Sequence, residues 1–238
     1  MERIVDLHMH VVPKYDDGSR SIDESIEMIK CSIRQGVTDI FCTSHNACCE
    51  EDIIIYNNHF EQLKKVVANK FYNIRLYKGC EVLCSDEDID EIIQYLNRGI
   101  FPTLGGSKFV LTEFYPDARL SEATVIIQKL IRAGYKPIIA HMERNIKLVG
   151  QAVSFLISLG AYIQVNAFSF SNECSEIWRK SAKLMLDHKQ IHFIGSDSHG
   201  IIHRPPKLID GINYIVSNTE GIYASEILYR NAENLLHI

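Results

Sequence analysis

The chain has 238 residues, of which 46% are hydrophobic and 23% charged, and its formal net charge is −5. This composition indicates a globular protein with a substantial core and excludes a largely disordered chain. The sequence contains no apolar run long enough to span a membrane and no long basic run, which argues against membrane insertion and against binding to nucleic acid.

Short apolar segments alternate with amphipathic segments along the chain, a pattern typical of parallel β/α architecture. The first strand is predicted at residues 3–7, and a helix with an S-x-x-E capping box at Ser21 and Glu24 follows it and ends at Gly36. Further strands are predicted at residues 39–44, 74–80, 109–113, 136–140, 161–166 and 191–196. Helices are predicted at residues 52–69, 87–97, 121–133, 147–159 and 175–188, with terminal helices over 207–238. This length suits one domain, residues 1–238, with the architecture of an α/β barrel.

Two histidines stand two residues apart at the end of the first strand, in the segment DLHMH. Side chains alternate along a strand, so His8 and His10 project to one face and Met9 to the other. Such a pair is more often part of a packed core than of a metal site. Metal binding becomes the better interpretation only if further ligands converge from other parts of the chain.

Ligand-type residues do recur at the C-terminal ends of the predicted strands. In chain order they are His8 with His10, His45, Glu81, Glu113, His141, Asn166, and Asp197 with His199, and Asp17 lies in the loop after the first strand. In a β/α barrel these strand ends face one mouth, where active sites are found. The five imidazoles and four carboxylates are too many for one ion. They fit two or three divalent ions, with carboxylates such as Glu81 bridging neighbouring ions.

A cluster of this kind favours phosphate chemistry. Three divalent ions outweigh four carboxylates in charge, so the site is positive and attracts an anion, and clustered ions lower the pKa of bound water. Arg144 and Arg204 closely follow ligand positions, and a planar guanidinium can hold two phosphate oxygens. The alternative for each arginine is an ordinary surface ion pair.

The ordered motifs HxH, DDG, TSH, a Glu after the third and fourth strands, AHxER and SDxHxxxxRPP resemble those of the PHP (polymerase and histidinol phosphatase) superfamily. More closely, they resemble the bacterial manganese-dependent protein tyrosine phosphatases associated with capsule and exopolysaccharide synthesis. The similarity extends from the first strand to about Pro206. It implies a single-domain, distorted TIM-like (β/α)7 barrel, the PHP fold, with a trinuclear metal centre.

The resemblance also implies roles for individual residues. It assigns the ligands of three ions as follows: His8, His10, Glu81 and Asp197; Asp17, His45 and His199; Glu81, Glu113 and His141. Asp17 is chosen over Asp16 because it directly precedes Gly18. Relatives that act on histidinol phosphate often have His at the places of Asp17 and Glu113, which favours the tyrosine phosphatase branch. Arg144 and Arg204 match arginines that contact phosphate in that branch. The implied metal is manganese, and the ligand types also suit iron or zinc.

The implied activity is that of a metal-dependent phosphoric monoester hydrolase acting on phosphotyrosine. The implied partner is the tyrosine-rich tail of a bacterial tyrosine autokinase that controls capsule or exopolysaccharide synthesis. Two alternatives remain: a small-molecule phosphatase or phosphoesterase of the superfamily, such as a histidinol phosphatase, and a catalytically silent regulatory barrel.

The cysteines bear on mechanism and location. A cysteine-dependent tyrosine phosphatase needs C-x5-R, and the nearest approach, Cys174 with Arg179, is one residue short. Seven cysteines at irregular spacing favour reduced thiols over a disulfide framework. With no signal-type segment in the sequence, a cytoplasmic location is expected.

Overall fold

All strand pairs are parallel in the computed structural model, which describes residues 3–47 and 49–236. The first sheet has the order β1-β2-β3 and consists of Val5–Met9, Asp39–Cys42 and Arg75–Lys78. The second has the order β4-β5-β6-β7-β8 and consists of Glu81–Cys84, Phe109–Phe114, Lys136–Ile139, Tyr162–Asn166 and Phe193–Gly195. The predicted parallel α/β class is therefore confirmed.

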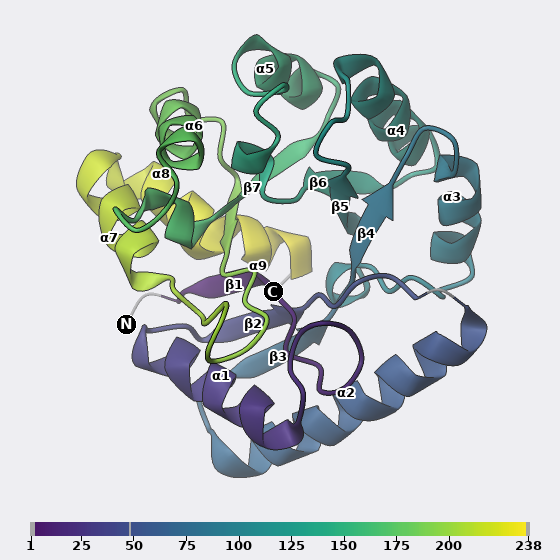
Figure 1. Ribbon diagram of the computed structural model, residues 1–238, viewed down its shortest axis with the longest axis vertical. Coiled ribbons are helices and arrows are strands. Elements are labelled where there is room, and N and C mark those ends of the chain that lie inside the picture. The colour runs from purple at the N-terminus through teal and green to yellow at the C-terminus, as the bar shows by residue number, and fades with distance from the viewer. Residues whose placement is uncertain (1–2, 48, 237–238) are drawn as a thin grey trace.

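Helices follow most strands and surround them (Figure 1). They are α1 (Ile22–Arg34), α2 (Glu50–Lys70), α3 (Ile89–Asn97), α4 (Leu120–Arg132), α5 (Gln151–Ser158), α6 (Glu176–Asp187), α7 (Ile209–Asn218), α8 (Gly221–Ser225) and α9 (Asn231–Leu236). Short 3-10 turns occur at η1 (Leu104–Gly106), η2 (Met142–Arg144) and η3 (Ala167–Phe170), and a π-helical segment, Glu226–Arg230, precedes α9. The predicted terminal helices run to residue 238, and the last two positions lie outside the described residues. None of the described helices is long and apolar enough to cross a bilayer.

The third predicted strand was wrong in its extent. Residues 74–84 form two strands, because the chain leaves the first sheet after Lys78 and enters the second at Glu81. Gly79 marks the break, where an added Cβ would lie 2.7 Å from Leu104 Cδ2. The described residues therefore contain eight strands where seven were predicted, and Glu81 begins a strand instead of following one.

Backbone contacts join the two sheets at the ends of the strands where the candidate ligands lie. The amide of Asp197 donates to His8 O at 2.7 Å, and the amide of His10 donates to Ser198 O at 3.0 Å. On the other side, the amide of Glu81 donates to Ser44 O at 3.0 Å. These contacts bring ligands from distant parts of the sequence together.

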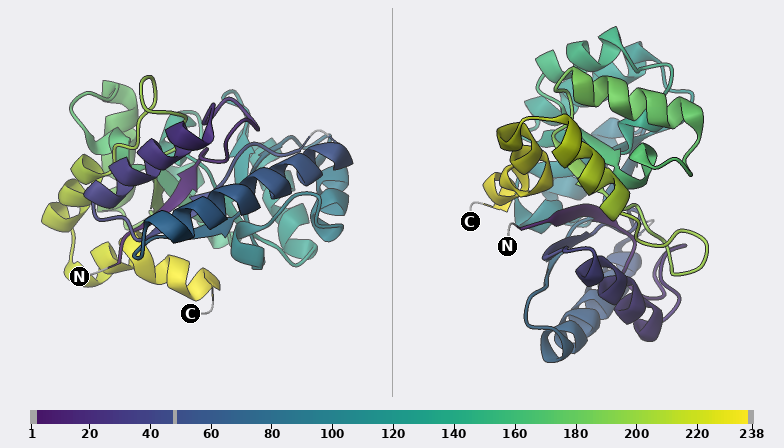
Figure 2. Two further views of the ribbon diagram at one scale, coloured as in Figure 1. Left: turned by 90° about the horizontal axis from the view of Figure 1, so that it is seen from below. Right: turned by 90° about the vertical axis from the view of Figure 1, so that its left-hand side faces the viewer.

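Apolar side chains fill the space among the strands at the opposite end. This cluster contains Val5, Leu7, Phe41, Leu104, Phe109, Leu111, Ile138, Ala140, Phe193, Ala232 and Leu235. Figure 2 shows α9, drawn in yellow, across this end of the strands, and its Ala232 and Leu235 contribute to the cluster. Apolar packing therefore fills this end of the strands, while the candidate ligands lie toward the other end.

The predicted capping box of α1 is only half formed. Ser21 Oγ accepts from the Glu24 amide at 3.1 Å, as expected for an N-cap. The Glu24 carboxylate accepts from the Arg20 amide at 2.9 Å instead of from Ser21, and its other oxygen lies 3.4 Å from the Ile201 amide. Glu24 thus connects α1 to the loop after β8.

Replacement of Ser21 by Ala should lower the free energy of unfolding by about 1 kcal/mol, because an N-terminal amide of α1 loses its acceptor. Urea titration followed by circular dichroism measures this change. Ser158→Ala is the matched control, since this exposed hydroxyl donates to a carbonyl of its own helix and caps no amide. Equal effects of the two substitutions would contradict the capping role.

Candidate metal centre and adjacent pocket

The two histidines of β1 face two buried carboxylates. His8 Nε2 and His10 Nε2 lie 3.1 Å apart, and each is 3.3 Å from Glu81 Oε2. Asp197 Oδ1 lies 3.6 Å from the first nitrogen and 3.8 Å from the second. Four ligand-type atoms from three strand regions therefore converge in the interior.

The outer nitrogens of the same imidazoles have acceptors as neighbours. His10 Nδ1 is 2.7 Å from Asp16 Oδ2, and His8 Nδ1 is 3.4 Å from Gln164 Oε1. In the form that can bind a metal, a proton on each Nδ1 would satisfy these acceptors and direct the Nε2 lone pairs toward Glu81. Lone pairs that converge on a carboxylate repel one another unless a cation lies among them. The residues present therefore fit a metal ion.

Protons are the alternative cations in this cluster. Burial disfavours charged His10, but hydrogen bonds to Asp16 and Glu81 outweigh this effect and raise its pKa to about 10. Burial likewise opposes charge on His141, while hydrogen bonds to Glu113 and Glu81 raise its pKa to about 10. Metal ions and protons therefore compete for the same nitrogens.

A second group lies around the loop that follows β1. Asp17 Oδ1 is 3.4 Å from Nε2 of both His45 and His199. Asp16 accepts from the His45 amide at 3.0 Å and the Gly18 amide at 3.0 Å, so it orients the loop and leaves Asp17 facing the imidazoles. A Cβ at Gly18 would lie 2.6 Å from His10 Cβ, which explains the glycine of the DDG motif.

Glu81 connects the remaining ligands. Its Oε1 lies 2.9 Å from His141 Nε2, which is also 3.4 Å from Glu113 Oε1. Its Oε2 lies 3.4 Å from His45 Nδ1, in addition to the two histidines of β1. Burial opposes ionisation of Glu81, but the surrounding imidazoles prevail and hold its pKa well below the usual range.

Two of these residues have left-handed backbone conformations, with φ of 30° at His141 and 51° at Asp197. Such angles are uncommon for residues other than glycine and persist where the surroundings enforce them. The His141 amide donates to Gln164 Oε1 at 2.7 Å, and the Asp197 amide donates to His8 O at 2.7 Å. The backbones of these two candidate ligands are thus fixed by hydrogen bonds that they donate to acceptors on neighbouring strands.

The candidate ligands form one continuous cluster with three overlapping groups. The groups are His10, Asp17, His45 and His199; His8, His10 and Asp197; and His45, Glu81 and Glu113, with ligand atoms within 4.8 Å of one another in each. The predicted assignment shared only Glu81 between ions. In these three groups His10 and His45 occur twice, Glu81 occurs once and His141 is absent, so the ligands of individual ions remain a prediction.

Gln164 is a functional candidate that the sequence analysis missed. Its Oε1 faces His8 and accepts from His141, while its Nε2 donates to Asn166 Oδ1 at 2.9 Å. Asn166 in turn donates to Asp197 Oδ2 at 3.0 Å. The sequence did contain an indication of this role. Gln164 stands two residues before the end of a largely apolar predicted strand, and β alternation places its side chain on the same face as that of Asn166.

Arg144 and Arg204 meet at the other oxygen of Asp197. The Nη2 atoms of both arginines lie 2.7 Å from Asp197 Oδ2, whereas Oδ1 faces the imidazoles. Asp197 is only 3% exposed, whereas the Arg144 and Arg204 side chains are 31% and 41% exposed, so each ion pair joins a partly exposed arginine to a buried carboxylate. Burial opposes its ionisation, but neighbouring His8 and Arg144 hold its pKa below the usual range. Whether the arginines contact phosphate remains a prediction.

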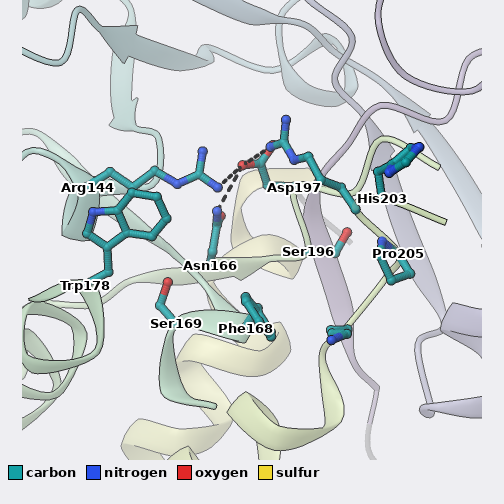
Figure 3. A pocket seen from close by; sticks show the side chains of 11 residues that line it. Arg144, Asn166, Phe168, Ser169, Trp178, Ser196, Asp197, His203 and Pro205 are labelled. Carbon is teal, nitrogen blue, oxygen red and sulfur yellow. Dashed lines mark hydrogen bonds and ion pairs between the residues drawn. The ribbon is translucent and has the colours of Figure 1, made fainter. Parts of the chain in front are cut away.

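A pocket of about 390 Å³ opens beside Asp197 (Figure 3). Arg144 lies along one wall with its guanidinium carbon 5.2 Å from the centre of the Trp178 ring. Its Nε has no hydrogen-bond partner among the described residues. Phe168, His203, Arg204 and Lys207 also line this pocket, which therefore joins three cationic side chains to aromatic walls.

A profile of the capsular polysaccharide synthesis family, CpsB/CapC, matches residues 4–237. The chain belongs to this family. It is 29% identical over 244 residues to the tyrosine-protein phosphatase CpsB of Streptococcus agalactiae serotype III (strain NEM316), which covers 98% of each chain. It is 34% identical over 207 residues to the putative tyrosine-protein phosphatase CapC of Staphylococcus aureus, covering 85% of this chain and 79% of that one.

Solved structures agree with the CpsB/CapC assignment. The fold matches a chain from crystal structures of YwqE from Bacillus subtilis and CpsB from Streptococcus pneumoniae, described as unique metal-dependent tyrosine phosphatases. The TM-score is 0.84 at 26% identity, with 98% of this chain and 94% of that chain covered. The predicted resemblance to the capsule-associated branch of tyrosine phosphatases is therefore confirmed.

Proposed function

We propose that this member of the CpsB/CapC family is a metal-dependent phosphatase that hydrolyses phosphotyrosine in proteins. The observation that carries the proposal is the position of Asp197. One of its oxygens faces the imidazoles of the candidate metal centre, and the other faces Arg144 and Arg204. A phosphate beside these arginines would therefore lie next to the metal ligands. The names of the similar CpsB and CapC proteins support the same activity.

The residues divide the chemistry between them. Bound divalent cations supply Lewis acidity, which lowers the pKa of water and offsets charge on the phosphoryl oxygens. Arg144 and Arg204 orient the phosphate through charge-assisted hydrogen bonds and stabilise the charge of the transition state. Asp16 and Gln164 keep the β1 imidazoles in the orientation needed for coordination. The tyrosinate leaving group needs little protonation, since a phenol has a pKa of about 10.

The proposed cofactor is two or three divalent ions, with manganese first and iron or zinc as alternatives. Mixed imidazole and carboxylate ligands suit all three metals, so supply as well as affinity decides which is bound. The proposed ligands are His8, His10, Asp17, His45, Glu81, Glu113, His141, Asp197 and His199. Their convergence supports the proposal, and the predicted division among three ions is retained as its starting form.

The proposal extends to architecture and partner. Bridges from Met9 to Ser198 and from His45 to Glu81 support closure of the two sheets into one distorted TIM-like barrel, acting as a single domain. The proposed substrate is the tyrosine-rich tail of a bacterial tyrosine kinase, which the capsule-synthesis family supports. The described cysteines are free thiols, in keeping with the proposed cytoplasmic location.

A substrate panel tests the proposed function. The purified protein, loaded with Mn²⁺, should hydrolyse a phosphotyrosine peptide with a higher kcat/KM than histidinol phosphate. Iodoacetamide should leave this activity intact, because no described cysteine lines the pocket or belongs to the candidate ligands, and burial raises the pKa of Cys42, Cys80 and Cys84. Faster hydrolysis of histidinol phosphate would instead support a small-molecule phosphatase.

Metal binding at pH 7.5 should release about one to two protons per chain, because His10 and His141 have pKa values of about 10 without metal. Below about pH 10 each of these imidazoles carries a second proton and is positively charged. It must lose that proton to coordinate a metal, so apparent metal affinity should rise as pH rises. Calorimetric titration with Mn²⁺ in buffers of different ionisation enthalpy measures the protons released.

The matched variants locate these protons. His141→Gln should reduce the number released, whereas His188→Gln should leave it unchanged, because His188 lies at the exposed end of α6. A binding enthalpy that is independent of the buffer would show that His10 and His141 are not protonated before metal binding.

A further inference from the structure

The pocket beside Asp197 is larger than a phosphate requires. Its volume is about 390 Å³, whereas a water molecule occupies about 30 Å³ in the liquid and a phosphate only a few times that. The guanidinium contacts converge at Asp197, which is buried, so the anionic group belongs at the deep end. The remaining space is available to the group that carries the phosphate.

Aromatic side chains line that remaining space. Trp178 is in the first turn of α6, where the Ser175 hydroxyl accepts from its amide, and its side chain stays 37% exposed although it packs on Arg144. Figure 3 shows Phe168 between Trp178 on one side of the pocket and His203 and Pro205 on the other. A flat aromatic group would find ring surface on more than one side here.

Buried hydrogen bonds to Glu143 fix the position of Phe168. Its neighbour Ser169 donates to Glu143 Oε1 at 2.7 Å, and Glu143 is fully buried and also accepts from the Asn166 amide at 3.2 Å. Lys207 Nζ lies 4.8 Å from the centre of the Phe168 ring. Because η3 is held by a buried carboxylate, this wall is formed before any ligand binds.

We propose that Trp178 and Phe168 form a slot for the ring of phosphotyrosine and thereby select it over phosphoserine and phosphothreonine. This inference rests on the proposed phosphatase function. In phosphoserine the phosphorus is two bonds from Cβ, so reaching Asp197 would draw the peptide backbone into the pocket. In phosphotyrosine the ring spans that depth, and its faces replace water on the aromatic walls.

Two phosphonates that resist hydrolysis separate the slot from the phosphate site. Benzylphosphonate carries a ring and methylphosphonate does not, and both are measured as competitive inhibitors of the Mn²⁺-loaded protein. Trp178→Ala and Phe168→Ala should each raise the inhibition constant of benzylphosphonate at least about fivefold, as expected for loss of an aromatic contact. The constant for methylphosphonate should change less than about twofold, and Trp178→Phe should retain most of the affinity for benzylphosphonate.

Control variants exclude indirect effects. Ile177→Ala changes an exposed apolar residue of the same helix that does not line the pocket, and it should alter neither constant. Trp178 also packs on Arg144. If its loss acted through the arginine, the inhibition constants of both phosphonates would rise together. Phe168→Ala leaves the aromatic partner of Arg144 in place. Its ring packs against Lys207, another residue of the pocket, so unchanged binding of methylphosphonate shows that the effect does not act through this cation.

The results for slot and function can be told apart. Equal weakening of both phosphonates by Trp178→Ala and Phe168→Ala, or equal binding of both by the wild-type protein, would overturn the slot. Hydrolysis of phosphotyrosine peptides would still support the phosphatase. In matched peptides, the ratio of kcat/KM for phosphotyrosine to that for phosphoserine should fall at least about fivefold in Trp178→Ala. The different reactivities of the two esters cancel when this ratio is compared between variant and wild type.

Discussion

Removal of divalent cations should reduce hydrolysis of a phosphotyrosine peptide at least about 1,000-fold, because Lewis-acid stabilisation of phosphoryl transfer is worth several kcal/mol. Added Mn²⁺ should restore the rate. The structural reason is the cluster around Glu81, whose buried oxygens and neighbouring imidazole nitrogens cannot replace a cation at the reacting phosphate. Initial rates after dialysis against EDTA, with elemental analysis of the same samples, measure both changes.

Glu81→Gln separates loss of metal from other effects of the chelator. The substitution keeps the side-chain shape but removes the charge that faces His8, His10 and His141, so metal content and activity should fall together. Mn²⁺ at the concentration that restores the wild-type protein should not restore this variant. Glu176→Gln is the matched control, because that residue is exposed on α6 and pairs with Lys180. A metal-free Glu81→Gln protein with full activity would contradict the proposed centre.

The convergence of the candidate ligands could be predicted because it depends on a short-range rule. Parallel β/α units place the C-terminal ends of their strands at one edge, so His8, His141 and Asp197 could be brought together from local patterns alone. The DDG motif was similarly informative. The close approach of Gly18 to His10 lets Asp16 hold the imidazole while Asp17 faces the other histidines.

Other features depend on contacts that no local pattern contains. The strand was predicted at residues 74–80, but β3 ends at Lys78, where Gly79 approaches Leu104, and a second strand begins at Glu81. The Glu24 carboxylate similarly leaves its expected place in the capping box, where the Arg20 amide and the loop at Ile201 provide its donors. Both departures come from partners distant in sequence, which propensity does not encode.

The orientation of the side chains within the site could not be predicted from the sequence either. The position of His45 after β2 indicated a ligand, but not that its two nitrogens would face Asp17 and Glu81 in different groups. Trp178 gave no signal because it lies on a helix instead of at a strand end. Side-chain orientation, rather than placement along the chain, therefore limited the prediction.

Replacement of Arg144 or Arg204 by Ala should lower kcat/KM on a phosphotyrosine peptide while leaving the metal content unchanged. Each loss removes charge-assisted hydrogen bonds worth about 1.5–3 kcal/mol, or roughly 10- to 150-fold in kcat/KM. The metal centre should persist because Asp197 Oδ2 keeps the other arginine and the amide of Asn166 as partners. Steady-state kinetics and elemental analysis on the same preparations measure both quantities.

The two arginines should not be equivalent. Both arginine side chains are partly exposed, at 31% for Arg144 and 41% for Arg204, but Arg144 is also packed on the Trp178 ring, so less entropy is lost when Arg144 binds phosphate. We therefore expect the larger loss for Arg144→Ala and only partial rescue by Lys, which keeps the charge without the planar pair of donors. His141→Ala should differ from both by losing metal as well. Wild-type kcat/KM in both arginine variants would mean that the guanidiniums only neutralise Asp197, and that the phosphate is bound without them.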